Sequence, residues 1–153
     1  MKIGDLAPDF ELESNTDEKI KLSSYRGKKK IILFFYVKDN TPGCTAEANG
    51  IKGQYPKILS KYEVIGINQD SRESHANFCQ KYNLPFKMLS DPNKKVAALY
   101  HARGILGAYT KRITYLIGLD GRIEGIIEGM SASNHVSFVQ NLADSAQLIK
   151  KRQ

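Results

Sequence analysis

The sequence predicts an α/β domain in which helices flank a mixed central β-sheet and a small β-hairpin comes first. Three observations support this prediction. The longest apolar run, residues 31–37, suits a strand that is buried on both faces. Further short apolar runs alternate with segments whose apolar residues recur at helical spacing. Near the end of the chain, Asp120-Gly121 separates two apolar runs, which is typical of a hairpin turn.

Each predicted element has a local signal. Strands are predicted from short apolar or alternating runs, and helices are predicted from apolar residues at three- and four-residue spacing. Asp70, Asp91 and Asn134 are expected to cap the helices that follow them, and a kink or break is expected near Pro56. In chain order, the predicted elements are a hairpin over 10–22, a strand at 31–37, a helix over 43–62, a strand at 64–67, a helix over 70–82, a strand at 86–89, a helix through 96–100, a loop over 102–111, strands at 113–119 and 123–127, and a last helix from 134.

Length and composition fit one globular domain over residues 1–153. The 153 residues are 41% hydrophobic and 25% charged, which is ordinary for a globular protein and excludes disordered and fibrous classes. The first residues lack the apolar run of a secretory signal, and no apolar run is long enough to span a bilayer. We therefore expect a cytoplasmic location and no contact with membranes.

The sequence holds two cysteines, Cys44 and Cys79. A reducing cytosol does not favour a permanent disulfide, so the pair is either inert core sulfur or redox chemistry. The Cys-x-x-Cys motif of dithiol exchange is absent from the sequence. The three histidines are too widely spaced for a metal-ligand motif, so no metal site is predicted.

Cys44 is expected in the first turn of a helix, directly after the buried strand. There, free backbone N–H groups and the positive end of the helix dipole stabilise a thiolate, which is the nucleophilic form. Thr41 can fold its hydroxyl back toward the sulfur, and Pro42 and Gly43 shape a tight turn that a small substrate can approach. An inert core cysteine is the alternative, but its polar neighbours favour a reactive thiol.

Several stretches, in order along the chain, resemble the peroxiredoxins of the bacterioferritin comigratory protein, or Q, type. These stretches are residues 4–10, 22–28, 35–48, 81–86, 89–91 and 112–117. The resemblance implies a thioredoxin-like fold and thiol-dependent reduction of hydrogen peroxide and organic hydroperoxides through a cysteine sulfenic acid. It implies no metal, flavin or haem, and it implies thioredoxin, glutaredoxin or a small thiol as the reductant. Relatives of this type are often monomers, so a monomer is expected.

The resemblance also implies roles for single residues. Cys44 matches the peroxidatic cysteine, and Thr41 matches the threonine whose hydroxyl binds the thiolate and the peroxide. Arg112 matches an arginine beside the sulfur, and Glu47 matches an acidic residue that helps to hold the site together. Arginine and N–H groups at this place would stabilise the negative charge that develops on the leaving oxygen. Without the resemblance, Arg112 would be interpreted as a surface residue at the start of a strand.

The chain departs from the family pattern at two positions. Val37 stands where the family has proline, so we expect the loop to be retained with a looser or slightly moved lip. Asn49 occupies the position, five residues after Cys44, where many relatives place a resolving cysteine. Cys79 is then the possible resolving thiol, and both helices would unwind locally to form the disulfide. Otherwise Cys79 is a core residue and an external thiol reduces Cys44 directly.

Two other functions remain open at this point. The net charge of +7 and the pI of about 9.4 permit a non-catalytic domain that binds nucleic acid or another partner. A lysine-rich, solvated surface is the favoured interpretation of that charge, and nucleic-acid binding is not expected. Dithiol–disulfide exchange through Cys44 and Cys79 is a third function, disfavoured by the absence of Cys-x-x-Cys.

Overall fold

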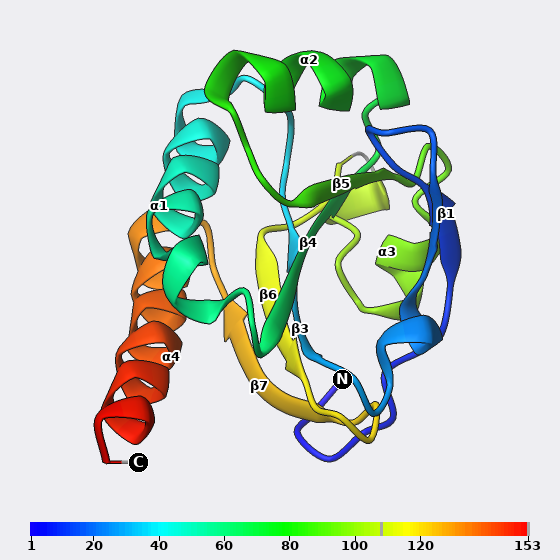
Figure 1. The fold of residues 1–153 in the computed structure, drawn as a ribbon. Helices are drawn as coiled ribbons and strands as arrows, with labels where there is room; N and C mark the ends of the chain where they lie inside the picture. Colours follow the sequence, from blue (N-terminus) through cyan, green and yellow to red (C-terminus); the bar gives the residue numbers. More distant parts are fainter. Residues whose placement is uncertain (108, 153) are drawn as a thin grey trace.

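The structure, a computed structural model, describes residues 1–107 and 109–152 (Figure 1). A five-stranded sheet with the order β5-β4-β3-β6-β7 forms its middle, and β1 and β2 form a separate hairpin. Strands β3, β4 and β5 are parallel, whereas β6 and β7 run antiparallel. The strands are β1 (Glu11–Glu13), β2 (Lys19–Lys21), β3 (Lys30–Phe35), β4 (Tyr62–Asn68), β5 (Lys87–Ser90), β6 (Ile113–Ile117) and β7 (Ile123–Glu128). The predicted mixed sheet and N-terminal hairpin are therefore confirmed.

Helices cover both faces of the sheet. The helices are α1 (Pro42–Ile58), α2 (Arg72–Tyr82), α3 (Lys95–Leu99) and α4 (Ala132–Arg152), with 3-10 turns η1 (Leu22–Tyr25) and η2 (Ile105–Gly107). Helices α1 and α4 lie side by side on one face (Figure 1) and share it with α2, whereas the hairpin, η1 and α3 lie over the other. None of the described helices is long and apolar enough to cross a membrane.

The central strand β3 divides the core in two. Its side chains alternate between the faces, so Ile31, Leu33 and Phe35 pack under the hairpin and α3. Ile32 and Phe34 pack under α1, α2 and α4. We call this second cluster the helix-side core; its buried members are Ile32, Phe34, Tyr36, Cys44, Ala48, Ile51, Ile58, Val64, Phe78, Cys79, Leu84, Phe86, Met88, Leu116, Val139 and Ala143. Both cysteines lie in the helix-side core.

Several element ends differ from the prediction. Helix α1 continues through Pro56 and ends two residues later, short of the predicted residue 62. The cap of α2 is Ser71, whose hydroxyl accepts a hydrogen bond from the first turn, and not Asp70. Helix α4 begins before Asn134, so that predicted cap is also wrong. Asp91 is not the N-cap of α3, because Lys94 occupies that position, although the Asp91 carboxylate accepts hydrogen bonds from the backbone N–H groups of Val96 and Ala97.

Helices α1 and α4 approach closely at Gly50. A Cβ atom at this position would lie 2.5 Å from a methyl group of Val136, so only glycine fits between the two helices. This contact sets how closely α1 packs against α4.

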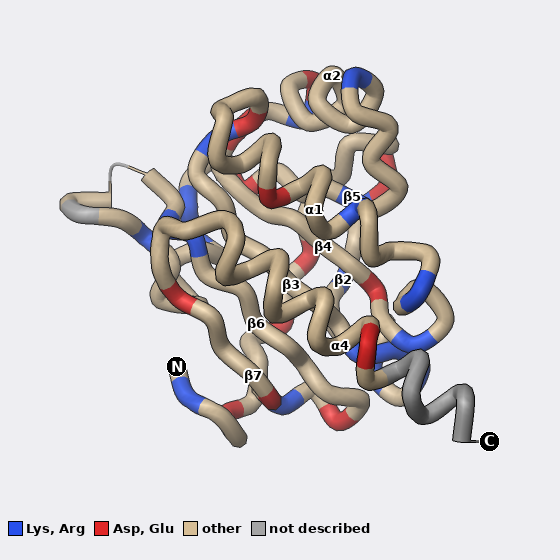
Figure 2. The backbone as a smooth tube through the Cα atoms, turned by 90° about the vertical axis from the view of Figure 1, so that its left-hand side faces the viewer, with Lys and Arg blue, Asp and Glu red and all other residues tan. Residues whose placement is uncertain are grey.

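Basic residues are spread over the molecule. Figure 2 shows Lys and Arg positions interspersed with Asp and Glu along the backbone. The lysines of β3 and the residues before it pair in part with acids, as in the Lys30–Glu124 ion pair of 2.9 Å. This pattern fits the solvated, lysine-rich surface favoured from the sequence.

Candidate active site

Cys44 lies in the first turn of α1, as its sequence context predicts. Thr41 is the N-cap residue and Pro42 occupies the first helical position, where the missing N–H costs nothing. The N–H groups of Gly43 and Cys44 precede the first helical hydrogen bond, which Thr45 N donates to Thr41 O at 2.8 Å. These N–H groups and the helix dipole favour an anion at the start of α1. The Cys44 side chain itself is buried, with 2% of its surface exposed.

Arg112 lies beside the sulfur because of the pairing of two strands. It directly precedes β6, and Ile113 of β6 pairs with Phe35 at the end of β3, where the loop to Cys44 begins. The Arg112 side chain is buried, and its Nη2 lies 3.4 Å from Cys44 Sγ. A Cβ atom at Gly43 would lie 3.1 Å from that same nitrogen, so glycine permits the close approach. A buried cation therefore faces the thiol directly.

Glu47 lies one turn after Cys44 and binds the same arginine. Its Oε1 accepts a hydrogen bond from Arg112 Nη1, and both side chains are buried. Burial raises the pKa of Glu47 to about 7, although the charge of Arg112 and its hydrogen bond act in the opposite direction. Burial likewise opposes the charge of Arg112, but Glu47 and Cys44 more than offset this and raise the pKa of the guanidinium. Arg112 thus stays cationic between Glu47 and Cys44.

His135 extends this buried network from α4, and sequence reasoning did not predict its place there. Its Nε2 lies 2.8 Å from Gly129 O, so this nitrogen carries the proton and donates. Burial lowers the pKa of His135, and in the neutral ring Nδ1 accepts the hydrogen bond of the Thr114 hydroxyl at 2.7 Å. The same Nδ1 lies 3.9 Å from Glu47 Oε2, an oxygen without a hydrogen-bond partner. His135 and Thr114 therefore form the inner wall behind Glu47.

The loop that leads to α1 is held by polar contacts. The Thr41 hydroxyl donates to Lys38 O at 2.8 Å, so in the resting structure its proton points into the loop and not at the sulfur. Val37 packs against the helix-side core, and its carbonyl accepts a hydrogen bond from Gln69 Nε2 at 3.1 Å. These contacts hold the loop in place with valine at position 37. Whether its lip is looser stays a prediction.

Cys79 lies on α2 and faces the same core as Cys44. Both thiols are free and buried, with 7% of Cys79 exposed. Burial, with a smaller contribution from the negative charge of Asp39, raises the pKa of Cys79 to about 12. The structure therefore gives Cys79 the surroundings of a protonated thiol. Asn49, five residues after Cys44, is exposed on α1.

A second buried polar cluster joins the end of β3 to α2. Asp39 Oδ1 accepts a hydrogen bond of 2.5 Å from the Tyr36 hydroxyl, and Oδ2 lies 2.7 Å from His75 Nδ1. The Ser74 hydroxyl also donates to Oδ2, at 2.8 Å. Sequence reasoning missed this cluster, because it joins residues of the loop after β3 to residues of α2 that are far apart in the chain.

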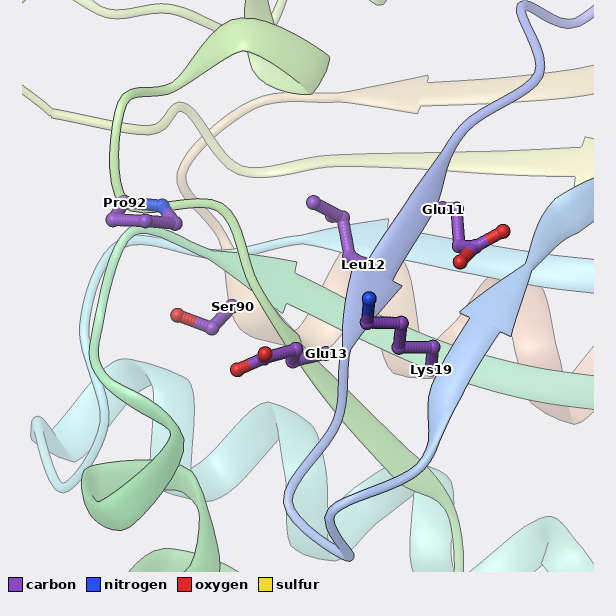
Figure 3. Close-up of a pocket in the computed structure, with 6 residues that line it drawn as sticks. All are labelled: Glu11, Leu12, Glu13, Lys19, Ser90 and Pro92. Carbon is purple, nitrogen blue, oxygen red and sulfur yellow. The ribbon is translucent and has the colours of Figure 1, made fainter.

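Two other kinds of site come into question, a metal centre and a surface cavity. Within 1–107 and 109–152, no group of three or more His, Cys, Asp or Glu residues is placed to hold a metal ion. A surface cavity of about 270 Å³ lies between the hairpin and the end of β5 (Figure 3). Its lining residues are Glu11, Leu12, Glu13, Lys19, Ser90 and Pro92. None of them belongs to the cluster around Cys44, which holds the only buried cation beside a thiol among the described residues.

Comparisons with known proteins show the family to which this chain is similar. The model of the AhpC/TSA family matches residues 3–126. Peroxiredoxin Bcp of Bacillus subtilis is 36% identical over 155 residues, which cover 96% of this chain and 98% of the relative. Peroxiredoxin Bcp of Escherichia coli is 32% identical and covers 92% of this chain and 94% of its own length. The crystal structure of peroxidoxin BcpB from Mycobacterium tuberculosis matches with a TM-score of 0.86 at 30% identity, over 95% of this chain and 97% of that chain.

Proposed function

The chain belongs to the AhpC/TSA family, and we propose that Cys44 is the thiol with which it reduces peroxides. Its relatives of the bacterioferritin comigratory protein type are peroxiredoxins, which are thiol-dependent peroxidases, and this chain is a thiol-dependent peroxidase with their thioredoxin-like fold. Peroxide substrates and thiol reductants follow from the family. The assignment to Cys44 is carried by one observation, the buried Arg112 guanidinium 3.4 Å from its sulfur at a helix start.

The proposed first step is attack of the Cys44 thiolate on one peroxide oxygen. An S–O bond forms, the O–O bond breaks, and the second oxygen leaves as hydroxide or alkoxide, which takes up a proton. Arg112 and the N–H groups of Gly43 and Cys44 stabilise the charge that develops on this oxygen. Thr41 contributes if its hydroxyl turns from Lys38 O toward the peroxide, a rotation about one side-chain bond. Cys44 is left as a sulfenic acid.

Glu47, Pro42 and Gly43 have supporting roles in this proposal. Glu47 orients the Arg112 fork through Nη1, so that Nη2 points at the sulfur. Pro42 fixes the backbone at the first helical position, and Gly43 leaves room for the guanidinium. These three residues act on the thiolate through backbone and arginine geometry.

We propose that Cys79 resolves the sulfenic acid through an intramolecular disulfide. Two features support this: Cys79 is the only other cysteine of the chain, and it faces the same core as Cys44. Because both thiols are buried, the first turn of α1 and part of α2 must open before the sulfurs meet. The second candidate is a one-cysteine enzyme in which an external thiol reduces Cys44, favoured by the raised pKa of Cys79.

The test combines kinetics with mass spectrometry. We expect wild-type protein to consume hydrogen peroxide and an organic hydroperoxide with a thiol donor, and Cys44→Ser to reduce neither above background. Cys79→Ser is the matched control, since it should still consume one equivalent of peroxide. After one equivalent, a Cys44–Cys79 disulfide supports the two-cysteine route. A sulfenic or sulfinic acid on Cys44 with Cys79 free supports the one-cysteine route, and equal rates for wild type and Cys44→Ser contradict the whole assignment.

The remaining partners follow from the same proposal. We expect thioredoxin, glutaredoxin or a small thiol as reductant, a cytoplasmic location and a monomer. Nucleic acid is not expected as a partner, because the basic residues are dispersed among acidic ones (Figure 2). Sedimentation of the reduced and oxidised protein checks the oligomeric state.

A further inference from the structure

His75 is a fully buried histidine whose ring is satisfied on one side only. Its Nδ1 lies 2.7 Å from Asp39 Oδ2, and because a carboxylate can only accept, Nδ1 carries the proton and donates. When the ring carries one proton, its lone pair is therefore on Nε2. This nitrogen is buried and has no hydrogen-bond partner.

Asp39 is fixed in place as the partner of this ring. Its carboxylate accepts hydrogen bonds from Tyr36 and Ser74 in addition to His75, and its own N–H donates to Asp70 at 2.7 Å. A carboxylate held in this way sets the tautomer and orientation of an imidazole and stabilises the imidazolium. Asp39 thus orients His75 as a general base is oriented in enzymes, and Nε2 is free to accept a proton.

A buried polar atom without a hydrogen-bond partner costs about 1–3 kcal/mol of folding free energy. If position 75 served only to bind Asp39, an asparagine side chain could do so at a lower cost than a histidine. The neighbour of His75 on α2 suggests why an imidazole ring stands at this position. Cys79 follows four residues later on α2, and both side chains are buried. Side chains at this spacing are neighbours, and the Cβ of the later residue leans back toward the earlier one.

Resting on the two-cysteine route proposed above, we propose that His75, oriented by Asp39, is the general base that takes the proton of Cys79 in the resolving step. The proton moves from the Cys79 thiol to Nε2, and the thiolate attacks Cys44 Sγ. The S–S bond forms, the S–O bond of the sulfenic acid breaks, and hydroxide leaves. Hydroxide takes the proton from the imidazolium and departs as water, so no further reagent is consumed.

A base at His75 would help the protonated Cys79 thiol to attack the sulfenic acid. Burial and Asp39 raise the pKa of Cys79 to about 12 in the closed structure. Even an exposed cysteine thiol, with a pKa of about 8.5, is mostly protonated at neutral pH, so the thiol is a poor nucleophile without assistance in either form. In the resting structure Nε2 forms no hydrogen bond with the thiol, so the transfer belongs to the form in which α2 has opened locally. A base on the same helix, one turn away, can stay close to Cys79 during that opening.

The test is His75→Asn, whose amide can still donate to Asp39 but which has no base at the position of Nε2. Oxidation of Cys44 and formation of the disulfide are followed separately by rapid acid quench and mass spectrometry. We expect the first rate to stay within about twofold of wild type and the second to fall about 100-fold, the usual contribution of a general base. Asn77→Ala, an exposed change on α2 between the two residues, is the matched control and should leave both rates unchanged.

The pH profile separates a base from a structural residue. In His75→Asn, disulfide formation should rise about tenfold per pH unit from neutral pH, because the thiol must ionise unaided. The wild-type rate should stay nearly flat for about two pH units above neutral, the range over which a 100-fold contribution from the base exceeds the unaided route. The groups that face His75 and could contribute are Tyr36, Asp39 and Cys79. If His75→Asn does not fold, the wild-type profile decides: a tenfold rise per pH unit that already begins at neutral pH overturns the proposal.

The outcomes distinguish three failures. No oxidation of Cys44 in wild type would defeat the peroxidase assignment. A sulfenic acid without a disulfide in wild type would defeat the two-cysteine route and this proposal with it. A disulfide that forms at the wild-type rate in His75→Asn would defeat the role of His75 alone.

Discussion

Cys44 and Cys79 lie in one apolar core but have opposite electrostatic surroundings. Their exposed fractions are nearly equal, at 2% and 7%. Cys44 has a guanidinium nitrogen 3.4 Å from its sulfur and lies at the positive end of a helix. Cys79 lies in the last turns of α2, and burial together with Asp39 raises its pKa to about 12. Exposure therefore does not separate the two thiols, whereas the charges that act on them, Arg112 and Asp39, have opposite signs.

This difference suggests a division of labour. A cysteine beside a cation is prepared to attack, while a buried cysteine on which an anion also acts stays protonated until a base or a conformational change activates it. Such an arrangement would keep Cys79 from reacting before Cys44 has been oxidised. Substitutions around Cys44 should reduce or increase this difference between the two thiols. Arg112→Met should have the largest effect and Gly43→Ala the smallest.

Arg112→Met should break the contrast most strongly, because it removes the cation and keeps an apolar chain of similar length. We expect the rate constant for oxidation of Cys44 by hydrogen peroxide to fall about 10²–10³-fold, the usual cost of one charge-stabilising donor. Rapid quench and mass spectrometry of reduced protein give this rate. Arg112→Lys keeps a charge without the planar fork and should fall less. An unchanged rate in Arg112→Met would show that the 3.4 Å contact has no chemical role.

Glu47→Gln should sharpen the contrast, since it leaves the charge of Arg112 uncompensated. The folded-state pKa of Glu47, about 7, lies above the ordinary value of 4.5, so the folded protein holds this proton more tightly than the unfolded chain does. The stability that the proton supplies is present in full below about pH 4.5 and is lost as the pH rises to about 7. This loss corresponds to about 3 kcal/mol, and the glutamine variant should lack it.

Urea unfolding of wild type and Glu47→Gln between pH 4.5 and pH 8 measures this difference. The free energy of unfolding of the variant should gain on wild type as the pH rises across that interval. Curves that stay parallel would mean that Glu47 keeps its ordinary titration in the folded protein, and that Arg112 compensates its burial completely.

The convergence of Cys44, Glu47 and Arg112 could be expected from the sequence, whereas the histidines behind and beside them could not. Cys44 and Glu47 share one local helix, and the family resemblance supplied Arg112. His135 reaches the site only because α4 packs on α1 and β6, a contact between residues far apart in the chain. Its place in the core has no periodic signature that distinguishes it from an ordinary first-turn residue.

The wrong cap at Asp70 has the same physical origin. Asp70 and Ser71 are both good caps by local chemistry. The carboxylate of Asp70 is instead bound by the backbone N–H of Asp39, which comes from the loop after β3. This long-range contact leaves Ser71 to cap α2, and local sequence patterns carry no information about it.

Thr41→Val should have a smaller effect than the loss of the cation. The change keeps the shape of the side chain but removes the hydroxyl that donates to Lys38 O and that we propose turns to the peroxide. We expect kcat/KM for hydrogen peroxide to fall about tenfold, consistent with the loss of one uncharged hydrogen bond in the transition state. Thr41→Ser restores the hydroxyl and should recover most of the activity. Lower stability with unchanged kcat/KM would show that Thr41 serves the turn alone.

Gly43→Ala should have the smallest effect and the most specific signature. The added Cβ would lie 3.1 Å from Arg112 Nη2, so the guanidinium must shift by a few tenths of an ångström from the sulfur. We expect the rate of Cys44 oxidation to fall about threefold, while stability holds or rises by up to about 1 kcal/mol because alanine favours the helix. Gly53→Ala is the matched control on the same helix, because a Cβ there meets nothing within 4 Å. It should raise stability in the same way and leave the rate unchanged. If both variants lose activity equally, the cause is a stiffer α1, which opens less readily; if only Gly43→Ala loses it, the cause is the distance between Arg112 and the sulfur.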